Sequence, residues 1–265
     1  MLKQFDIDSA KIACWVNNND KQNIFFIHGS GSDHTAWSHQ YARLNKKYNI
    51  VAVDLPGHGS SSGGGEADVG SYCLWIKKLL NILDLKNTVL VGHSLGAAVA
   101  LRFSLDYPQY LAGIVLIGAG IKMPVNPFML EFLKTNPAEI PPEILDLMCK
   151  FSLAKENRVK LSDPLRKSLS QSSVKVLYGD LSACNDLDLT EEICKINMPA
   201  LIVCGAEDKM TPADFSRQLA ACINGAKLEI IDGAGHMVML EKPDEFNVSL
   251  DKFAALISAV NSGEG

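Results

Sequence analysis

Ser94, His236 and an acidic pair at positions 207 and 208 are the residues whose types and spacing suit nucleophilic catalysis. Ser94 is the centre of the glycine-flanked pentapeptide at residues 92–96, which follows an apolar run and precedes a helical stretch. A G-x-S-x-G pattern at a strand-to-helix junction predicts a strained turn that exposes the serine hydroxyl. Such a turn brings its flanking residues close together, so glycine is needed where a Cβ would clash.

The acid and the base that a serine nucleophile needs follow two later apolar segments. Serine becomes reactive when a base takes its proton, and an acid must orient that base and stabilise its cation. Glu207 and Asp208 directly follow one apolar run, and His236 follows the next. Because the carboxyl ends of parallel strands meet at one edge of a sheet, we expect Ser94, one of the two acids and His236 to converge there.

Short apolar runs alternate with helical segments along most of the chain. A hairpin is expected at residues 5–7 and 12–16, and further strands at residues 24–27, 50–53, 88–91, 113–117, 200–204 and 227–231. Helical periodicity follows at residues 72–83, 97–103, 213–221 and 243–260. This alternation predicts an α/β fold with a mostly parallel sheet flanked by helices.

Between residues 121 and 198 the alternation stops. Six prolines divide this stretch into short helical pieces, two of which have amphipathic periodicity. We therefore predict a core domain of residues 1–120 and 199–265, with residues 121–198 inserted as a helical cap. Soft apolar side chains are candidates for a substrate pocket, namely Met123, Phe128, Met129, Phe132, Met210 and Met237. Packing of the cap on the core, with no ligand between them, would produce the same periodicity.

The composition is that of an ordinary globular protein. Of the 265 residues, 47% are hydrophobic and 21% charged, and the formal net charge is −5. A chain with no basic excess is not expected to bind nucleic acid. No apolar run is long enough to span a membrane, and the first residues lack a signal-peptide pattern. The composition does not indicate an oligomeric state.

The cysteines and histidines do not form recognisable metal or redox motifs. Seven cysteines are scattered without a C-x-x-C pair, which favours free thiols and a cytoplasmic location. We expect no metal and no cofactor, because ligand spacings and a phosphate-binding Gly-Lys-Ser/Thr pattern are missing from the sequence. His28 and His93 adjoin glycines and are predicted to orient loops. His34, His39 and His58 are predicted to be loop or surface residues.

Five motifs together resemble the α/β-hydrolase fold superfamily, in its branch of esterase- and lipase-like serine hydrolases with a helical cap. They lie at residues 28–31, 54–60, 92–96, 205–212 and 233–236 and cover nearly the whole chain outside residues 121–198. The resemblance implies that Ser94 is the nucleophile, Asp208 the acid and His236 the general base. It also implies an oxyanion hole formed by the backbone N–H groups of Ser30 and Leu95.

The serine at position 94 narrows the activity that the resemblance implies. Haloalkane dehalogenases and epoxide hydrolases have aspartate at this position, and dienelactone hydrolases have cysteine. We therefore expect a carboxylesterase that cleaves small to medium apolar esters through an acyl-enzyme. A carbon–carbon bond hydrolase of ring-fission products ranks second, although such relatives usually have Asn and Met where this chain has His93 and Leu95. The resemblance also allows a thioesterase, a lactonase or a binding protein without turnover.

Overall fold

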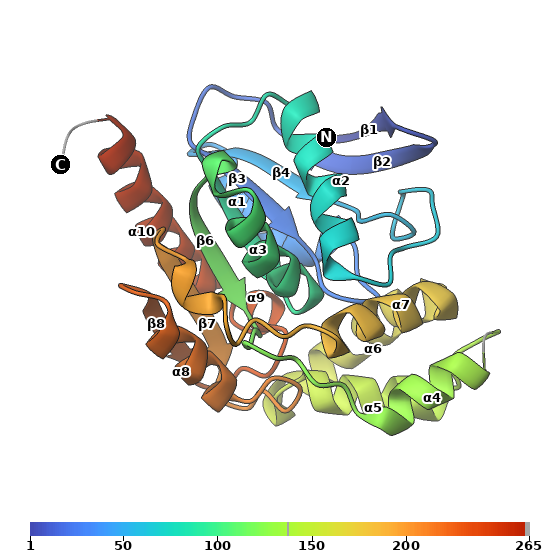
Figure 1. Cartoon of the computed structure of the whole chain (residues 1–265). Helices are drawn as coiled ribbons and strands as arrows, with labels where there is room; N and C mark the ends of the chain where they lie inside the picture. The colour runs from blue at the N-terminus through green and yellow to red at the C-terminus, as the bar shows by residue number, and fades with distance from the viewer. Residues whose placement is uncertain (137, 263–265) are drawn as a thin grey trace.

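The computed structural model describes residues 1–136 and 138–262, and its centre is an eight-stranded sheet (Figure 1). The strands are β1 Leu2–Ile7, β2 Ala10–Val16, β3 Asn23–Ile27, β4 Asn49–Val53, β5 Thr88–His93, β6 Leu111–Ile117, β7 Ala200–Gly205 and β8 Lys227–Ile231. Their order in the sheet is β1-β2-β4-β3-β5-β6-β7-β8. Strand β2 is antiparallel to β1 and to β4, and the remaining pairs are parallel. The predicted α/β fold with a mostly parallel sheet is confirmed.

The position of each strand in the sheet explains its sequence. Every residue of β5 is buried, because helices cover both faces of the sheet at its centre. The edge strand β1 instead alternates exposed and partly buried residues. Continuous apolar runs therefore mark the central strands, and the alternating hairpin marks the edge.

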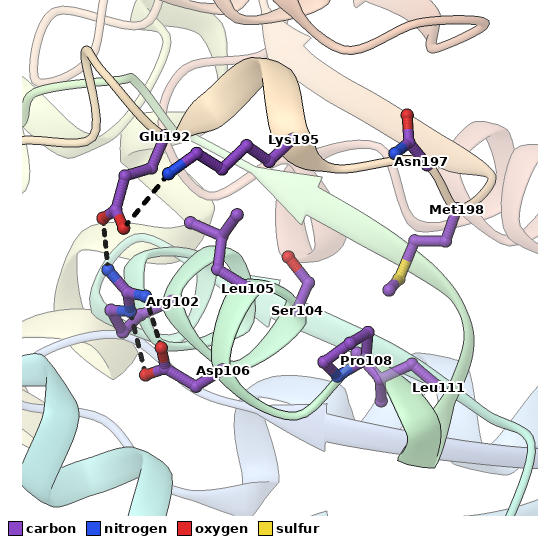
Figure 2. A pocket seen from close by; sticks show the side chains of 10 residues that line it. All are labelled: Arg102, Ser104, Leu105, Asp106, Pro108, Leu111, Glu192, Lys195, Asn197 and Met198. Carbon is purple, nitrogen blue, oxygen red and sulfur yellow. Dashed lines mark hydrogen bonds and ion pairs between the residues drawn. The ribbon is translucent and has the colours of Figure 1, made fainter.

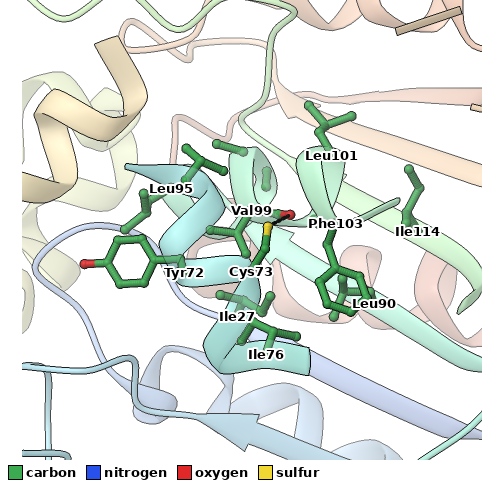
Figure 3. Packing of buried hydrophobic residues seen from close by; sticks show 14 of the residues in the cluster. Ile27, Tyr72, Cys73, Ile76, Leu90, Leu95, Val99, Leu101, Phe103 and Ile114 are labelled. Atoms are coloured by element: carbon green, nitrogen blue, oxygen red, sulfur yellow. Dashed lines mark hydrogen bonds between the residues drawn. The ribbon is translucent and has the colours of Figure 1, made fainter. Parts of the chain in front are cut away.

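Helices cover both faces of the sheet. They are α1 Ser38–Leu44, α2 Val69–Ile82, α3 Leu95–Asp106, α8 Ala213–Cys222, α9 Val238–Glu241 and α10 Pro243–Ser262, with 3-10 helices η1 His34–Trp37, η2 Pro108–Tyr110, η3 Lys155–Asn157 and η4 Ile193–Lys195. On one face, α2 and α3 pack against strand residues such as Leu90 and Ile114 (Figure 3). On the other face, α10 and η1 pack against Phe26 and Val91. Neighbouring residues of one strand thus pack into two separate hydrophobic cores, one on each face of the sheet.

Residues 121–136 and 138–198, here named the cap segment, lie beyond the carboxyl ends of the central strands (Figure 1). The helices of this segment are α4 Pro127–Thr135, α5 Pro142–Ser152, α6 Arg158–Gln171 and α7 Val174–Asn185. They share an apolar cluster that includes Leu133, Leu145, Leu169 and Leu177. Sequence periodicity located α4 and α5, but neither α6 nor α7 was predicted. Helix α6 is largely polar and contains Pro164, and α7 is buried on more than one side, so its apolar residues do not form a single stripe. The division into a core domain and a cap stays a prediction.

Among residues 1–136 and 138–262, no helix combines the length and the apolar character needed to cross a membrane.

Candidate active site

Ser94 occupies a strained turn between β5 and α3. Its backbone has φ 52° and ψ −115°, a conformation that a residue with a side chain rarely adopts. The turn is held on one side by the Ser94 N–H, which donates to the carbonyl of Ile117 at 2.9 Å. A Cβ on Gly92 would lie 2.1 Å from the carbonyl oxygen of Gly96, and a Cβ on Gly96 would lie 2.2 Å from that of Ile27. The two glycines are therefore required by the close approach of the helix to the strands.

His236 and Asp208 form a buried pair at the same edge of the sheet. The imidazole Nδ1 of His236 lies 2.8 Å from Oδ2 of Asp208. Burial tends to raise the pKa of the Asp208 carboxyl, but the charge of His236 and several hydrogen bonds outweigh it and lower that pKa. An ionised Asp208 keeps the proton of the imidazole on Nδ1, so that Nε2 is free to accept a proton.

Thr211 completes the support of the carboxylate and was not identified from the sequence. Its hydroxyl donates to Oδ2 of Asp208 at 2.9 Å and lies 3.2 Å from Nδ1 of His236. Oδ1 of Asp208 accepts the backbone N–H groups of Met210 and Thr211, both at 2.9 Å. The signal that could have revealed this role is its place three residues after Asp208, in the loop just before α8.

The structure brings together the three residues that were predicted to converge. Ser94 and His236 line the same two cavities. The Nε2 atom of His236 is buried and has no hydrogen-bond partner within residues 1–136 and 138–262. Glu207, the neighbouring acid, instead accepts a hydrogen bond from the backbone N–H of Lys155 at 3.3 Å. Asp208 is therefore the acid that contacts the imidazole.

Close packing of two loops sets the position of His236 relative to Asp208. A Cβ on Gly205 would lie 2.1 Å from the carbonyl oxygen of Gly235, so the loops after β7 and β8 touch at their bases. The N–H of Glu207 donates to the carbonyl of Ala234 at 2.9 Å. The N–H of His236 donates to the carbonyl of Ser152 in the cap segment at 2.8 Å. The His236 loop is thus held by the sheet on one side and by the cap segment on the other.

The carboxylate of Glu241 links the His236 loop to the cap segment. This role of Glu241 was not predicted from the sequence. One of its oxygens accepts the N–H groups of Gly235 at 2.9 Å and Met237 at 3.1 Å. The other accepts the N–H of Ala154 at 2.8 Å and the amide of Asn157 at 3.0 Å. Four donors from two segments make Glu241 a positioning residue for His236.

Two further residues limit where the imidazole of His236 can lie. The ring of His93 packs against it with centroids 4.7 Å apart, and Nε2 of His93 donates to the backbone carbonyl of His236 at 3.0 Å. Burial, together with repulsion from His236, holds the pKa of His93 well below its usual range, so His93 stays neutral. Gly118 has φ 60°, and a Cβ there would lie 2.7 Å from Cε1 of His236.

The backbone N–H groups of Ser30 and Leu95 are free beside Ser94. Leu95 is the first residue of α3, where helix geometry supplies no acceptor for its N–H. Ser30 follows Gly29, and a Cβ on Gly29 would lie 3.1 Å from Cβ of Ser94, so the loop after β3 touches the serine. Neither N–H donates to another group within the described part of the chain. Both are therefore available to a ligand oxygen, as an oxyanion hole requires.

Two cavities meet at Ser94 and His236. The larger, of about 330 Å³, is lined by the predicted residues Met123, Phe128, Met129 and Met210. The smaller, of about 50 Å³, is lined by Met237 and by residues 29–32. Phe132, one helical turn after Phe128, lines neither of them; its ring lies 6.2 Å from that of Phe128, and it packs against the apolar cluster of the cap segment.

Residues 24–248 match the sequence profile described as the Alpha/beta hydrolase family. The chain belongs to the alpha/beta hydrolase family. The hydrolase is 35% identical to a solved structure described as a thermophilic esterase, with a TM-score of 0.85 over 97% of this chain and 99% of that one. It is 27% identical to the 2-hydroxy-6-oxononadienedioate/2-hydroxy-6-oxononatrienedioate hydrolase of Paraburkholderia phymatum over 90% of each chain. An enol-lactonase from Burkholderia xenovorans LB400 has the same fold, with 17% identity and a TM-score of 0.88 over 96% of this chain and 100% of that one.

The hydrolase also has a larger hollow far from these residues (Figure 2). It has a volume of about 610 Å³ and lies at the amino ends of β6 and β7, opposite to the edge that carries Ser94. Its charged side chains pair with one another: Arg102 bonds to Asp106 and to Glu192, and Lys195 lies 4.0 Å from Glu192. Its size alone would favour this hollow as the active site. Its charged side chains, however, neutralise one another, and its described lining residues include no nucleophile beside a base.

His58 in the hydrolase lies in the loop after β4, in agreement with one of the two predicted locations, but it is buried and is not a surface residue. Its side chain lies under the cap segment, where Nε2 is 2.9 Å from Oδ2 of Asp180 on α7. His34 is partly buried, and its Nδ1 lies 2.8 Å from Oδ1 of Asp54. Both pairings join residues that are distant in sequence, so no local sequence pattern predicts them.

Proposed function

We propose that this hydrolase is a carboxylesterase that uses Ser94 as nucleophile, His236 as general base and Asp208 as the acid that orients it. The observation that carries the proposal is the unpaired, buried Nε2 of His236, which faces the cavities that Ser94 also lines. Its other nitrogen is held 2.8 Å from Asp208. An imidazole held in this way can act as a general base, because its free Nε2 can take a proton from a neighbouring hydroxyl.

In the first half of the reaction, Oγ of Ser94 attacks the ester carbonyl carbon and its proton passes to Nε2 of His236. The carbonyl oxygen becomes an oxyanion that the N–H groups of Ser30 and Leu95 stabilise. Collapse of this intermediate breaks the bond to the alcohol oxygen, which receives the proton from His236. The alcohol leaves, and the acyl group remains bonded to Ser94.

In the second half, water replaces the alcohol. His236 takes a proton from the water as it attacks the acyl carbon, and the same two N–H groups stabilise the second oxyanion. The bond to Oγ of Ser94 then breaks, and His236 returns the proton to that oxygen. Carboxylic acid is released and the enzyme returns to its starting state.

The larger cavity supports an apolar ester substrate. Five methionine, phenylalanine and leucine side chains from α4 and α5 line it, and Lys209 is its one cationic residue among the described lining residues. Such a wall binds apolar groups through the hydrophobic effect. The 35% identical relative described as an esterase supports the same activity.

A carbon–carbon bond hydrolase is the second candidate, and the relative from Paraburkholderia phymatum supports it. The substrate in the name of that relative is a dioate, which carries two carboxylates. Anions of this kind are usually bound by Arg or Lys side chains that pair with each carboxylate. The single Lys209 and the apolar walls therefore favour an uncharged ester over a dicarboxylate.

Hydrolysis of p-nitrophenyl esters from acetyl to palmitoyl tests the proposal. Wild type should hydrolyse the shorter esters, and Ser94→Ala should lower kcat by at least about 10⁴-fold, because it removes the nucleophile. Ser104→Ala, at the other end of α3, is the matched control and should keep wild-type activity. If folded wild type hydrolyses no ester but cleaves a ring-fission diketo acid, the carbon–carbon hydrolase replaces the esterase.

A further inference from the structure

The two cavities at Ser94 differ in how they connect to solvent. Most residues that line the smaller one are buried, among them Leu169, Leu177 and Met237, and its exposed lining residue, Met210, lines both cavities. The larger has an apolar rim at the surface, where Phe128 is 63% exposed and Phe151 45% exposed. A group in the larger cavity can therefore reach solvent directly, whereas the smaller cavity is the more enclosed of the two.

The smaller cavity is narrow because the loop at residues 29–32 packs tightly against the cap segment. A Cβ on Gly31 would lie 2.9 Å from Cδ2 of Leu169 and 3.5 Å from Cδ1 of Leu177. The hydroxyl of Ser168 donates to the carbonyl of Gly31 at 3.3 Å and holds α6 to the same loop. A volume of about 50 Å³ accommodates about four water-sized spheres, which corresponds to a short alkyl chain.

The order of the two half-reactions decides which part of an ester each cavity must hold. The alcohol departs first, while the acyl group is still bonded to Ser94, and water must then reach the acyl carbon. An alcohol in the smaller, more enclosed cavity would have to leave past the acyl group. An alcohol in the larger cavity departs through the exposed rim and leaves a path for water.

Resting on the esterase activity proposed above, we propose that the smaller cavity is an acyl pocket for chains of about two to four carbons. The larger cavity holds a bulkier apolar alcohol group. Leu169 and Leu177 close the far end of the acyl pocket and set the longest acyl chain. The substrate class is therefore the short-chain acyl esters, acetates to butyrates, of large apolar alcohols.

A pair of isomeric esters tests the orientation directly. Naphthalen-2-ylmethyl acetate has a small acyl group and a large alcohol, and methyl naphthalen-2-ylacetate has the reverse arrangement. Because one surplus methylene in a closed apolar pocket costs about 10- to 200-fold, we expect kcat/KM to favour the acetate by at least about tenfold. A preference for the methyl ester, or equal rates, would overturn the assignment of the two cavities.

A chain-length series tests the two leucines. With p-nitrophenyl esters, wild type should prefer acetyl to butyryl, and Leu177→Ala should shift the preference to longer chains, with a gain of about tenfold or more for the hexanoyl ester relative to the acetyl ester. Phe128→Ala, in the wall of the larger cavity, is the matched control and should leave the preferred acyl length unchanged. An unshifted profile in a folded Leu177→Ala would contradict the acyl pocket.

Leu169→Ala provides an independent second variant, since Leu177 is fully buried and its truncation can reduce stability. Thermal melting shows whether each variant is folded before its profile is read. Failure of the inference and failure of the proposed function give different results. Wild type that hydrolyses no ester contradicts the esterase, whereas wild type that hydrolyses esters with the reverse preference contradicts only the acyl pocket.

Discussion

Nε2 of His58 lies 2.9 Å from Oδ2 of Asp180, and this buried pair joins the loop after β4 to helix α7 of the cap segment. The other ring nitrogen of His58 lies 3.0 Å from the carbonyl oxygen of Pro56, so both nitrogens face acceptors and both carry a proton. Tyr72 donates to the second oxygen of Asp180 at 2.5 Å. Because α7 also carries Leu177, the pair positions one wall of the proposed acyl pocket.

Replacement of His58 by glutamine should destabilise the protein. Asp180 would keep its buried charge but lose its cation, and removing one partner of a buried ion pair typically costs about 3–5 kcal/mol in the free energy of unfolding. Chemical denaturation of wild type and His58→Gln at pH 6 measures this difference. Tyr72→Phe, which removes one neutral donor to the same carboxylate, should cost about 1–3 kcal/mol.

The stability difference between wild type and His58→Gln should depend on pH. Burial lowers the pKa of His58, but attraction to Asp180 and the hydrogen bond with it outweigh burial, so the pKa is raised in the folded state. The stabilisation is therefore complete below the ordinary histidine pKa of about 6.5 and is lost as the pH rises through the folded-state value. Melting temperatures between pH 6 and 10 should show the two proteins converging with rising pH. A constant difference would mean that His58 is not charged.

Asp208→Asn should leave the fold intact and lower kcat by about 10⁴-fold, because an amide no longer holds the imidazole with its proton on Nδ1. Circular dichroism and p-nitrophenyl acetate kinetics measure the two effects. Glu207→Gln is the matched control, since Glu207 contacts Lys155 and not His236. Equal losses in both variants would show that a different acid serves His236.

Esterase activity should rise with pH through one ionisation and then level off. His236 must be neutral to take the proton of Ser94, whereas Asp208 stays ionised because its pKa is lowered in the folded protein. The value of kcat/KM should therefore change about tenfold per pH unit on the acid side. A flat profile between pH 5 and 8 would argue against His236 as the base.

Gly118→Ala should reduce activity far more than stability. The new methyl group would lie 2.7 Å from Cε1 of His236 and displace the imidazole, and a displacement of about 1 Å at a catalytic group costs about 10²-fold in rate. The positive φ of Gly118 adds a strain of about 1–2 kcal/mol. Gly225→Ala is the control for strain, because Gly225 also has a positive φ of 73° but no neighbouring atom within 4 Å of the added carbon. It should lose comparable stability and keep its activity.

Elements with a strong local pattern were predictable from the sequence, and those with a weak one were not. Strand β5 is a continuous apolar run because helices cover it on both sides, and α5 has clear amphipathic periodicity. Helix α6 is mostly polar, because much of its surface faces solvent and only residues such as Leu169 contact other helices. Its sequence therefore carries little of the hydrophobic signal from which a helix is inferred.

The sequence by itself determined the turn at Ser94 and the order of the residues around it, because steric limits on the backbone act between near neighbours. Glycines at positions 92 and 96, a serine between them, and acidic and histidine residues after later strands are local facts. Only the tertiary structure decided that Asp208 contacts His236 while Glu207 faces Lys155.

The burial of His58 and the sizes of the two cavities were likewise decided by the tertiary structure. His58 and Asp180 are 122 residues apart in the chain, and the smaller cavity forms between a core loop and cap helices. Such contacts depend on how whole helices pack against the sheet. Packing of that kind is a property of many side chains together, so no short stretch of sequence contains it.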